Sequence, residues 1–271
     1  MKSRAQPLEG GSLSHVERVG DTVRRTTGPW TPAVHALLRH LESRGFLQAP
    51  RVLGIDEQGR EILSFLPGRA GGADSSQAGW VWSEETLAQT GRWLRGYQQA
   101  VSDFVEPAGA RWRMSWDAQA QDQIICHFDV APRNLVLGPD QEIRVIDWDV
   151  AAPGTAKLEL AKVANSFAPV HDPQARKSLD FEQGVLSPEM LRLCIQRVRV
   201  LLDAYGLDDR RDFVLQMLAA ADHTILRVQR GAREGDDALR RLIDSGALHK
   251  VQATRELFAS YLEPLQYGIE A

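Results

Sequence analysis

The sequence has few cysteines, little net charge and no long apolar run, and each of these absences excludes a class of protein. Only two cysteines, Cys126 and Cys194, occur among 271 residues, so a disulfide framework is excluded and a reducing cytoplasm is the expected compartment. A net charge of −4 and a pI of about 6.0 provide no basic surface for nucleic acid. No apolar stretch reaches membrane-spanning length, and the N-terminal residues lack the apolar core of a signal peptide.

The remaining composition is that of an ordinary globular protein. Hydrophobic residues make up 43% of the chain and charged residues 25%. The length allows one large or two small domains, with enough apolar material for a core. The composition leaves the oligomeric state open.

Residues 127–149 combine a loop of the pattern H-x-D-x-x-x-x-N with an apolar strand that ends in an aspartate. The loop contains His127, Asp129 and Asn134, and Asp147 follows 13 residues after Asn134. Phosphoryl transfer needs a carboxylate that orients and deprotonates a hydroxyl, and an amide and a second carboxylate that hold magnesium on the phosphates. The pattern therefore predicts Asp129 as the catalytic base, and it assigns His127 a structural role.

The spacing between Asn134 and Asp147 has a physical reason. Two apolar runs, 135–137 and 143–146, flank the turn Gly138-Pro139-Asp140-Gln141, which indicates a hairpin. The two ends of a hairpin lie side by side, so Asn134 and Asp147 are predicted to meet. One oxygen atom from each side chain can then bind the same Mg²⁺ ion.

These residues resemble the aminoglycoside phosphotransferase family, whose loop typically reads H-G-D-x-x-P-x-N and whose metal motif reads I-D-W or I-D-F. This chain has His127, Asp129, Pro132 and Asn134, followed by Ile146-Asp147-Trp148. Three positions depart from the family pattern. Phe128 and Ala131 replace residues that are usually small or polar, and Glu159 stands where the family has the aspartate that braces the catalytic loop.

The resemblance implies an α+β, protein-kinase-like bilobal fold. A small antiparallel sheet would form an N-terminal nucleotide-binding lobe over residues 1–66. A larger, mainly helical lobe over residues 67–271 would carry catalysis and acceptor binding. The implied cofactors are Mg²⁺ and ATP, with GTP as an alternative.

The order of elements in the first lobe agrees with that fold. Strands are predicted at 16–19 and 22–25, a helix from an N-cap at Thr31 to Gly45, and strands at 52–55 and 61–66. The Gly10-Gly11 turn is a candidate for covering phosphates. Pro67-Gly68 marks the hinge, so backbone groups of Ser64, Phe65 and Leu66 are predicted to bind the adenine edge.

The lysine that holds the nucleotide phosphates in such kinases is missing from the matching strand, which reads Thr22-Val23-Arg24-Arg25-Thr26. Side chains alternate along a strand, so only one of the two arginines can face the cleft. The resemblance favours Arg24, because it follows an apolar residue as the lysine usually does. The usual partner is a helix glutamate, and the only acid of the helix, Glu42, lies near its end.

Helices are predicted over 83–101, 158–168, 187–205, 209–231 and 235–264. The expected reaction is transfer of the γ-phosphate of ATP or GTP to a hydroxyl of a small molecule, such as an aminoglycoside or another antibiotic. A nucleotide-binding pseudokinase or regulatory module is the alternative. Acids of the helical half suit a cationic acceptor, although acids on helices more often form a solvated face; they are Asp180, Glu182, Glu189, Asp203 and Asp222.

Overall fold

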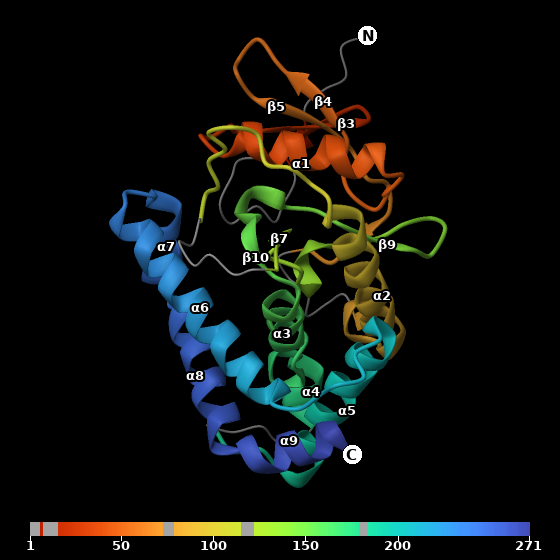
Figure 1. The fold of residues 1–271 in the computed structure, drawn as a ribbon, viewed down its shortest axis with the longest axis vertical. Coiled ribbons are helices and arrows are strands. Elements are labelled where there is room, and N and C mark those ends of the chain that lie inside the picture. The colour runs from red at the N-terminus through yellow and green to blue at the C-terminus, as the bar shows by residue number, and fades with distance from the viewer. Residues whose placement is uncertain (1–5, 8–15, 73–78, 115–121, 179–183) are drawn as a thin grey trace.

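The chain folds into a small antiparallel sheet with one helix at its N-terminal end and a larger, mainly helical part beyond it (Figure 1). This is the α+β architecture that the sequence predicts. The computed structural model describes residues 6–7, 16–72, 79–114, 122–178 and 184–271. The Gly10-Gly11 turn therefore lies outside the described residues.

Five strands form the N-terminal sheet in the order β1-β2-β3-β5-β4, with antiparallel pairing throughout. The predicted hairpin of β2 and β3 is confirmed, with Val19 opposite Thr22. The last predicted strand ends at Ser64, two residues earlier than expected. The strands are β1 (Gln6–Pro7), β2 (Val16–Val19), β3 (Thr22–Arg25), β4 (Val52–Ile55) and β5 (Glu61–Ser64).

Helix α1 (Thr31–Ser43) follows this hairpin and buries its apolar face. Its buried residues recur at helical spacing, as predicted, and include Val34, Leu37, Leu38 and Leu41. The predicted N-cap is wrong, because Thr31 is the first helical residue and Trp30 precedes it. The hydroxyl of Thr31 instead accepts a hydrogen bond of 2.9 Å from the Gly28 N–H, which fixes the loop before the helix.

Two small antiparallel sheets lie between the N-terminal lobe and the helices. The predicted hairpin is confirmed as β8 and β9, with Leu135 opposite Val145. A short strand at Arg69–Ala70 adds to this hairpin, so the chain has left the N-terminal sheet by residue 69. The other sheet matches no strand that the sequence predicts. The strands are β6 (Arg69–Ala70), β8 (Leu135–Leu137) and β9 (Ile143–Val145), and β7 (Gln123–Cys126) with β10 (Ala152–Thr155).

Helices build the rest of the molecule, with α3 near its centre and α6 and α8 along one side (Figure 1). One predicted helix, 235–264, is wrong as a single element, since the chain breaks at Gly246, whose φ is 76°, and again at Tyr261. The helices are α2 (Glu84–Val101), α3 (Ala156–Ser166), α4 (Pro173–Ser178), α5 (Pro188–Tyr205), α6 (Phe213–Arg233), α7 (Asp237–Asp244), α8 (Ala247–Ser260) and α9 (Leu262–Glu270).

The apolar core runs continuously from α1 through α2 to the C-terminal helices. Aromatic residues at its centre support the catalytic loop: Trp148 packs edge-on against Tyr97 and His127, with ring centres 5.3 and 4.4 Å apart. None of the helices in the described segments combines the length and the apolar character needed to cross a membrane.

Candidate active site

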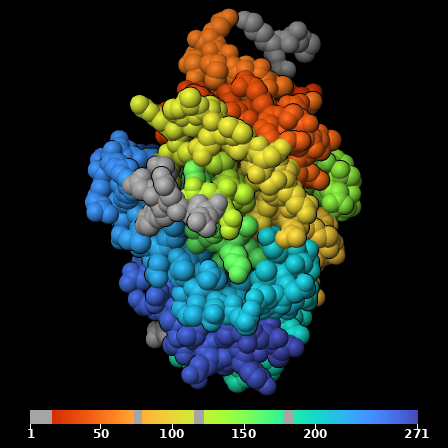
Figure 2. All heavy atoms as spheres, viewed as in Figure 1, coloured from red at the N-terminus to blue at the C-terminus, as the bar shows by residue number. Residues whose placement is uncertain are grey.

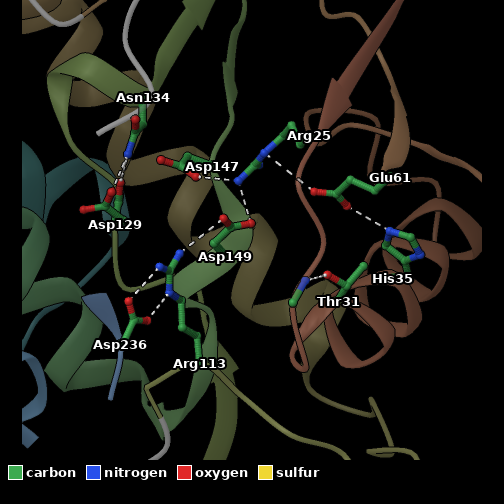
Figure 3. A network of polar contacts seen from close by, with 11 residues as sticks. Arg25, Thr31, His35, Glu61, Arg113, Asp129, Asn134, Asp147, Asp149 and Asp236 are labelled. Carbon is green, nitrogen blue, oxygen red and sulfur yellow. Dashed lines mark hydrogen bonds and ion pairs between the residues drawn. The ribbon is translucent and has the colours of Figure 1, made fainter. Parts of the chain in front are cut away.

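Asp129 and Asn134 lie in direct contact at the two ends of the catalytic loop (Figure 3). The Asn134 amide nitrogen donates to a carboxylate oxygen of Asp129 at 2.7 Å and to its backbone carbonyl at 2.8 Å. Arg133 donates to the other carboxylate oxygen at 2.5 Å. Both contacts leave lone pairs on the Asp129 carboxylate for a further hydrogen bond. The loop therefore fixes this carboxylate in one orientation.

The β8–β9 hairpin brings the metal-motif aspartate to the same place. The Ile146 N–H donates to the Asn134 carbonyl at 3.0 Å, which sets Asp147 beside Asn134 as the hairpin predicts. Asp147 has a left-handed φ of 69°, a conformation that asparagine and aspartate tolerate better than most residues. A carboxylate and an amide offer the hard oxygen atoms that Mg²⁺ prefers, so the two side chains fit such an ion.

Glu159 braces the catalytic loop from α3. One of its carboxylate oxygens accepts hydrogen bonds from the backbone N–H groups of His127, at 2.6 Å, and Phe128, at 3.1 Å. The longer side chain thus makes the bracing contact that the family aspartate was expected to make. His127 is fully buried, and its Nδ1 accepts from the Asp129 N–H at 3.1 Å. Burial lowers the pKa of His127 to about 4, so the ring is neutral and acts as a structural support.

Burial raises the pKa of Glu159 to about 7, although the two backbone hydrogen bonds oppose the shift. The folded state therefore holds this proton more tightly than the unfolded chain, whose glutamate has a pKa near 4.5. We expect this group's stabilisation to be complete below pH about 4.5 and to be lost as the pH rises through about 7. Over this pH range, the free energy of unfolding should decrease by a total of about 3 kcal/mol through Glu159.

Chemical unfolding of the wild type and of Glu159→Gln across pH 4 to 8 measures this effect. As the pH rises, the wild type should lose more unfolding free energy than the variant, so the variant should become relatively more stable. The buried histidines have lowered pKa values, so their contribution to stability changes with pH in the opposite direction. This contribution is the same in both proteins and therefore cancels in the difference. A difference that is constant with pH would show that Glu159 does not titrate in this range.

Phe128 occupies a position whose backbone is suited to glycine. Its φ is 59°, and the family pattern has glycine at this place. The ring is 1% exposed and packs near the Arg227 guanidinium, whose carbon lies 4.3 Å from the ring centre. Apolar burial and this cation–π contact offset the backbone strain of about 1–3 kcal/mol.

The structure places Arg25, rather than Arg24, next to the metal motif. The Arg25 guanidinium lies 3.0 Å from Asp147 and 2.6 Å from Asp149. Arg24 points to the other side of the strand, where it contacts Asp56 at 3.7 Å. The side chains alternate as predicted, and the arginine beside the metal motif is Arg25, not the Arg24 that the resemblance favoured.

The charge of Arg25 is held in place by carboxylates. Burial lowers its pKa, but Asp149, Asp147 and Glu61 outweigh that effect and raise the pKa above its usual value. Glu61 lies opposite Arg25 in the sheet register, at 3.6 Å. His35 on α1 contacts the other oxygen of Glu61 at 2.9 Å. Helix α1 is therefore connected to the buried Arg25 through His35 and Glu61. Glu42, the only acid of the helix, is exposed and does not take the place of the usual helix glutamate.

A further ion-pair chain continues from Asp149 into the helical lobe (Figure 3). Arg113 lies 3.6 Å from Asp149 and 2.7 Å from Asp236, which caps α7. Its guanidinium also stacks over Trp30, 4.3 Å from the ring centre. None of the three residues Asp149, Arg113 and Asp236 was predicted from the sequence. In the sequence, only the second aspartate of Asp147-Trp148-Asp149 could have indicated these contacts. Arg113 and Asp236 are 123 positions apart, so no local pattern connects them.

An open cleft of about 770 Å³ adjoins this chain of ion pairs. Its lining includes Trp30, Arg111 and Arg113 together with residues 234–238. Figure 2 shows the yellow segment after α2 between the red N-terminal lobe and the blue α6 and α7. Solvent-accessible space therefore lies next to Arg113 and its partners.

The three residues predicted to bind the adenine edge, Ser64, Phe65 and Leu66, differ in whether their backbone N–H groups are already hydrogen-bonded. The Ser64 N–H donates to the Arg51 carbonyl and the Phe65 N–H to the Asp21 carbonyl, both at 2.9 Å. Within the segments that the structure describes, no hydrogen bond occupies the Leu66 N–H. Of the three predicted residues, Leu66 is thus the one whose backbone can still donate.

Comparison with known proteins identifies the family of this chain. The model of the phosphotransferase enzyme family matches residues 72–193. The trifolitoxin immunity protein of Rhizobium leguminosarum bv. trifolii is 37% identical over 223 residues, which cover 80% of this chain and 80% of that protein. The chain belongs to the phosphotransferase enzyme family. The resemblance inferred from the catalytic-loop motif is confirmed.

Solved structures share the fold at low sequence identity. A choline/ethanolamine kinase family protein from Mesorhizobium loti has a TM-score of 0.59 and 12% identity, covering 99% of this chain and 92% of that one. Amicoumacin kinase in complex with AMP-PNP, Ca²⁺ and Ami has a TM-score of 0.62 and 10% identity, covering 94% of this chain and 88% of that one. The kinase-like fold expected of this phosphotransferase is confirmed.

Proposed function

We propose that this phosphotransferase transfers the γ-phosphate of ATP to a hydroxyl group of a small molecule, and that this reaction inactivates a toxic compound such as an antibiotic. The observation that carries the proposal is the contact between Asp129 and Asn134 beside Asp147. It combines a fixed base with two oxygen ligands for a metal ion. The boundary between the nucleotide-binding and catalytic lobes falls after residue 66, between β5 and β6.

Asp129 orients the acceptor hydroxyl and takes its proton as the new P–O bond forms and the bond between the γ-phosphate and the leaving ADP breaks. Asn134 and Asp147 would hold Mg²⁺, which would neutralise charge on the phosphates. The Asn134 nitrogen already donates to Asp129, which leaves its side-chain oxygen as the atom that could bind the ion. GTP remains the alternative donor, and the amicoumacin kinase bound to AMP-PNP and Ca²⁺ supports a nucleotide–metal complex of this kind.

Arg25 contacts the nucleotide phosphates, since it is a cation of the N-terminal lobe that lies 3.0 Å from Asp147 of the metal motif. Its planar group can bind two phosphate oxygens at once. The Leu66 N–H donates to the adenine edge, and Ser64 and Phe65 flank it. In this arrangement the acceptor approaches Asp129 from the helical lobe.

Asp147→Asn should weaken the affinity for Mg-ATP as well as the rate, because it removes a charged metal ligand. We expect the Kd of Mg-ATP to rise about tenfold or more, by analogy with the loss of a charge-assisted contact. Asp140→Asn is the matched control, because Asp140 lies at the exposed tip of the same hairpin and pairs with Arg144. Calorimetry that finds equal Mg-ATP affinity in the two variants would contradict the metal role of Asp147.

The toxic-compound part of the proposal comes from the trifolitoxin immunity protein, at 37% identity. The experiment is incubation of the purified chain with Mg²⁺ and γ-labelled ATP in the presence of antibiotics, amino alcohols and hydroxy acids. Label transferred to one of these compounds, with loss of its toxicity to a sensitive strain, supports the proposal.

A nucleotide-binding module without catalysis is the second candidate. It is favoured by the two arginines that already contact the key carboxylates, Arg25 on Asp147 and Arg133 on Asp129. The same experiment separates the two candidates. A chain that binds Mg-ATP tightly but labels no acceptor is a binding module.

A further inference from the structure

Cationic side chains without carboxylate partners lie beside the catalytic loop, on the side of α3 and α6. Lys162 Nζ lies 5.7 Å and the Arg227 guanidinium carbon 4.3 Å from the centre of the Phe128 ring. Arg227 is 3% exposed and donates to the backbone carbonyls of Met114 and Val150. Across the described ranges, no carboxylate forms an ion pair with Lys162 or Arg227. This side of the loop therefore carries two cations that no carboxylate contacts directly in the described residues, although the Asp129 carboxylate acts on Lys162 from a longer distance.

Lys162 is the member of this pair that a solute can reach. It is partly exposed, and it lies one turn after Glu159 on α3, on the face that braces the catalytic loop. Burial lowers its pKa to about 8, while the Asp129 carboxylate raises it, so Lys162 is mostly protonated near neutral pH. A charged amine close to the catalytic carboxylate is thus available to a ligand.

The acids considered for a cationic acceptor do not offer a matching negative site. Those in the described part of the helical lobe are each neutralised by an arginine, in the pairs Glu189–Arg192, Asp203–Arg210 and Asp222–Arg255. Asp180 and Glu182 lie outside the described residues. The charge next to Asp129 therefore favours an acceptor of the opposite sign.

We propose that Lys162 binds a carboxylate of the acceptor whose hydroxyl group meets Asp129. This inference rests on the proposed function and makes the acceptor a hydroxy compound with a carboxylate. Lys162 is a specificity residue in this arrangement, and the buried Arg227 adds to the positive field without touching the ligand.

The position of Lys162 favours the acceptor over the nucleotide. It belongs to α3, whose Glu159 braces the loop at His127 and Phe128, and its amine lies over the Phe128 ring. The cation that contacts Asp147 is Arg25 of the N-terminal sheet. Lys162 therefore lies on the side of the helical lobe, from which the acceptor is proposed to approach.

The test compares matched ligands that differ only in their charge. N-acetylserine and a short seryl peptide are each prepared as the free carboxylate and as the primary amide, and calorimetry measures their binding to the full chain with Mg-AMP-PNP. The wild type should bind each carboxylate about tenfold or more tightly than its amide. Lys162→Met should abolish this preference and Lys162→Arg should restore most of it.

Lys157→Met is the matched control, because Lys157 is an exposed residue of the same helix. It should retain the wild-type preference. Equal binding of carboxylate and amide by the wild type, or no binding of either, overturns the inference. An equal loss of affinity for the carboxylate and for the amide in Lys162→Met also overturns the inference.

Phosphoryl transfer to the same ligands separates this inference from the proposed function. A preference for carboxylates that depends on Lys162, without transfer, supports the site and contradicts the kinase proposal. Efficient transfer to amides and to cationic acceptors supports the kinase and overturns the carboxylate site. If Lys162→Met raises the KM for ATP with every acceptor, Lys162 binds the nucleotide. This result would also overturn the inference that Lys162 binds the acceptor carboxylate.

Discussion

Asp129→Ala should abolish phosphoryl transfer while leaving the affinity for Mg-ATP nearly intact. The variant removes the base and the group that orients the hydroxyl, which together contribute about 10²–10⁴-fold or more to the rate. The affinity should persist, since the contacts of Asp129 are to Asn134 and Arg133 in its own loop. Steady-state kinetics with the identified acceptor and calorimetry with Mg-AMP-PNP measure the two quantities.

Asp129→Asn provides a second test of the same assignment. Asparagine keeps an oxygen for the contact with Asn134 or Arg133, so the loop should keep its geometry, but it cannot take a proton. We expect the rate to fall nearly as far as in the alanine variant. Asp140→Ala, at an exposed position of the following hairpin, is the control. A kcat above half of the wild-type value in either Asp129 variant would show that another group is the base.

Arg25→Ala should both destabilise the fold and weaken nucleotide binding. The substitution leaves Glu61 and Asp149, which are 3% exposed each, without their shared cation. Removing one partner of a buried ion pair costs about 3–5 kcal/mol, and we expect the lower end because His35 and Arg113 remain. Loss of a charge-assisted contact to phosphate should raise the KM for ATP about 10- to 150-fold. Chemical unfolding and kinetics measure the two effects.

Arg24→Ala is the matched control, one position earlier on the same strand. Its partner Asp56 is also bound by Arg60, so the expected loss of stability is below about 1 kcal/mol and the KM should change little. Arg25→Lys tests whether charge alone is sufficient, because a lysine cannot bridge Asp147 and Asp149 in the same planar geometry. Equal, small effects of the two alanine variants would exclude Arg25 from the nucleotide site and favour the binding-module candidate.

Local sequence patterns predicted the elements that short-range physics controls. The hairpin that joins Asn134 to Asp147 follows from two apolar runs around a Gly-Pro-Asp turn, and the structure confirms its pairing. Helices α1, α2 and α5 follow from apolar periodicity, and Ser83 and Ser187 cap the last two as capping residues should. The helix predicted over residues 235–264 failed because a glycine in a left-handed conformation interrupts a continuous pattern.

The sequence by itself determined the kinase-like fold and the grouping of the proposed catalytic trio of Asp129, Asn134 and Asp147, since these residues lie within one loop and one hairpin. The tertiary structure alone decided which arginine faces that trio, because strand alternation narrows the choice to one of two and only packing selects the side. It also decided the partners of Arg25 and Arg113 and the position of Lys162. These contacts join segments far apart in the chain, and no local periodicity records them.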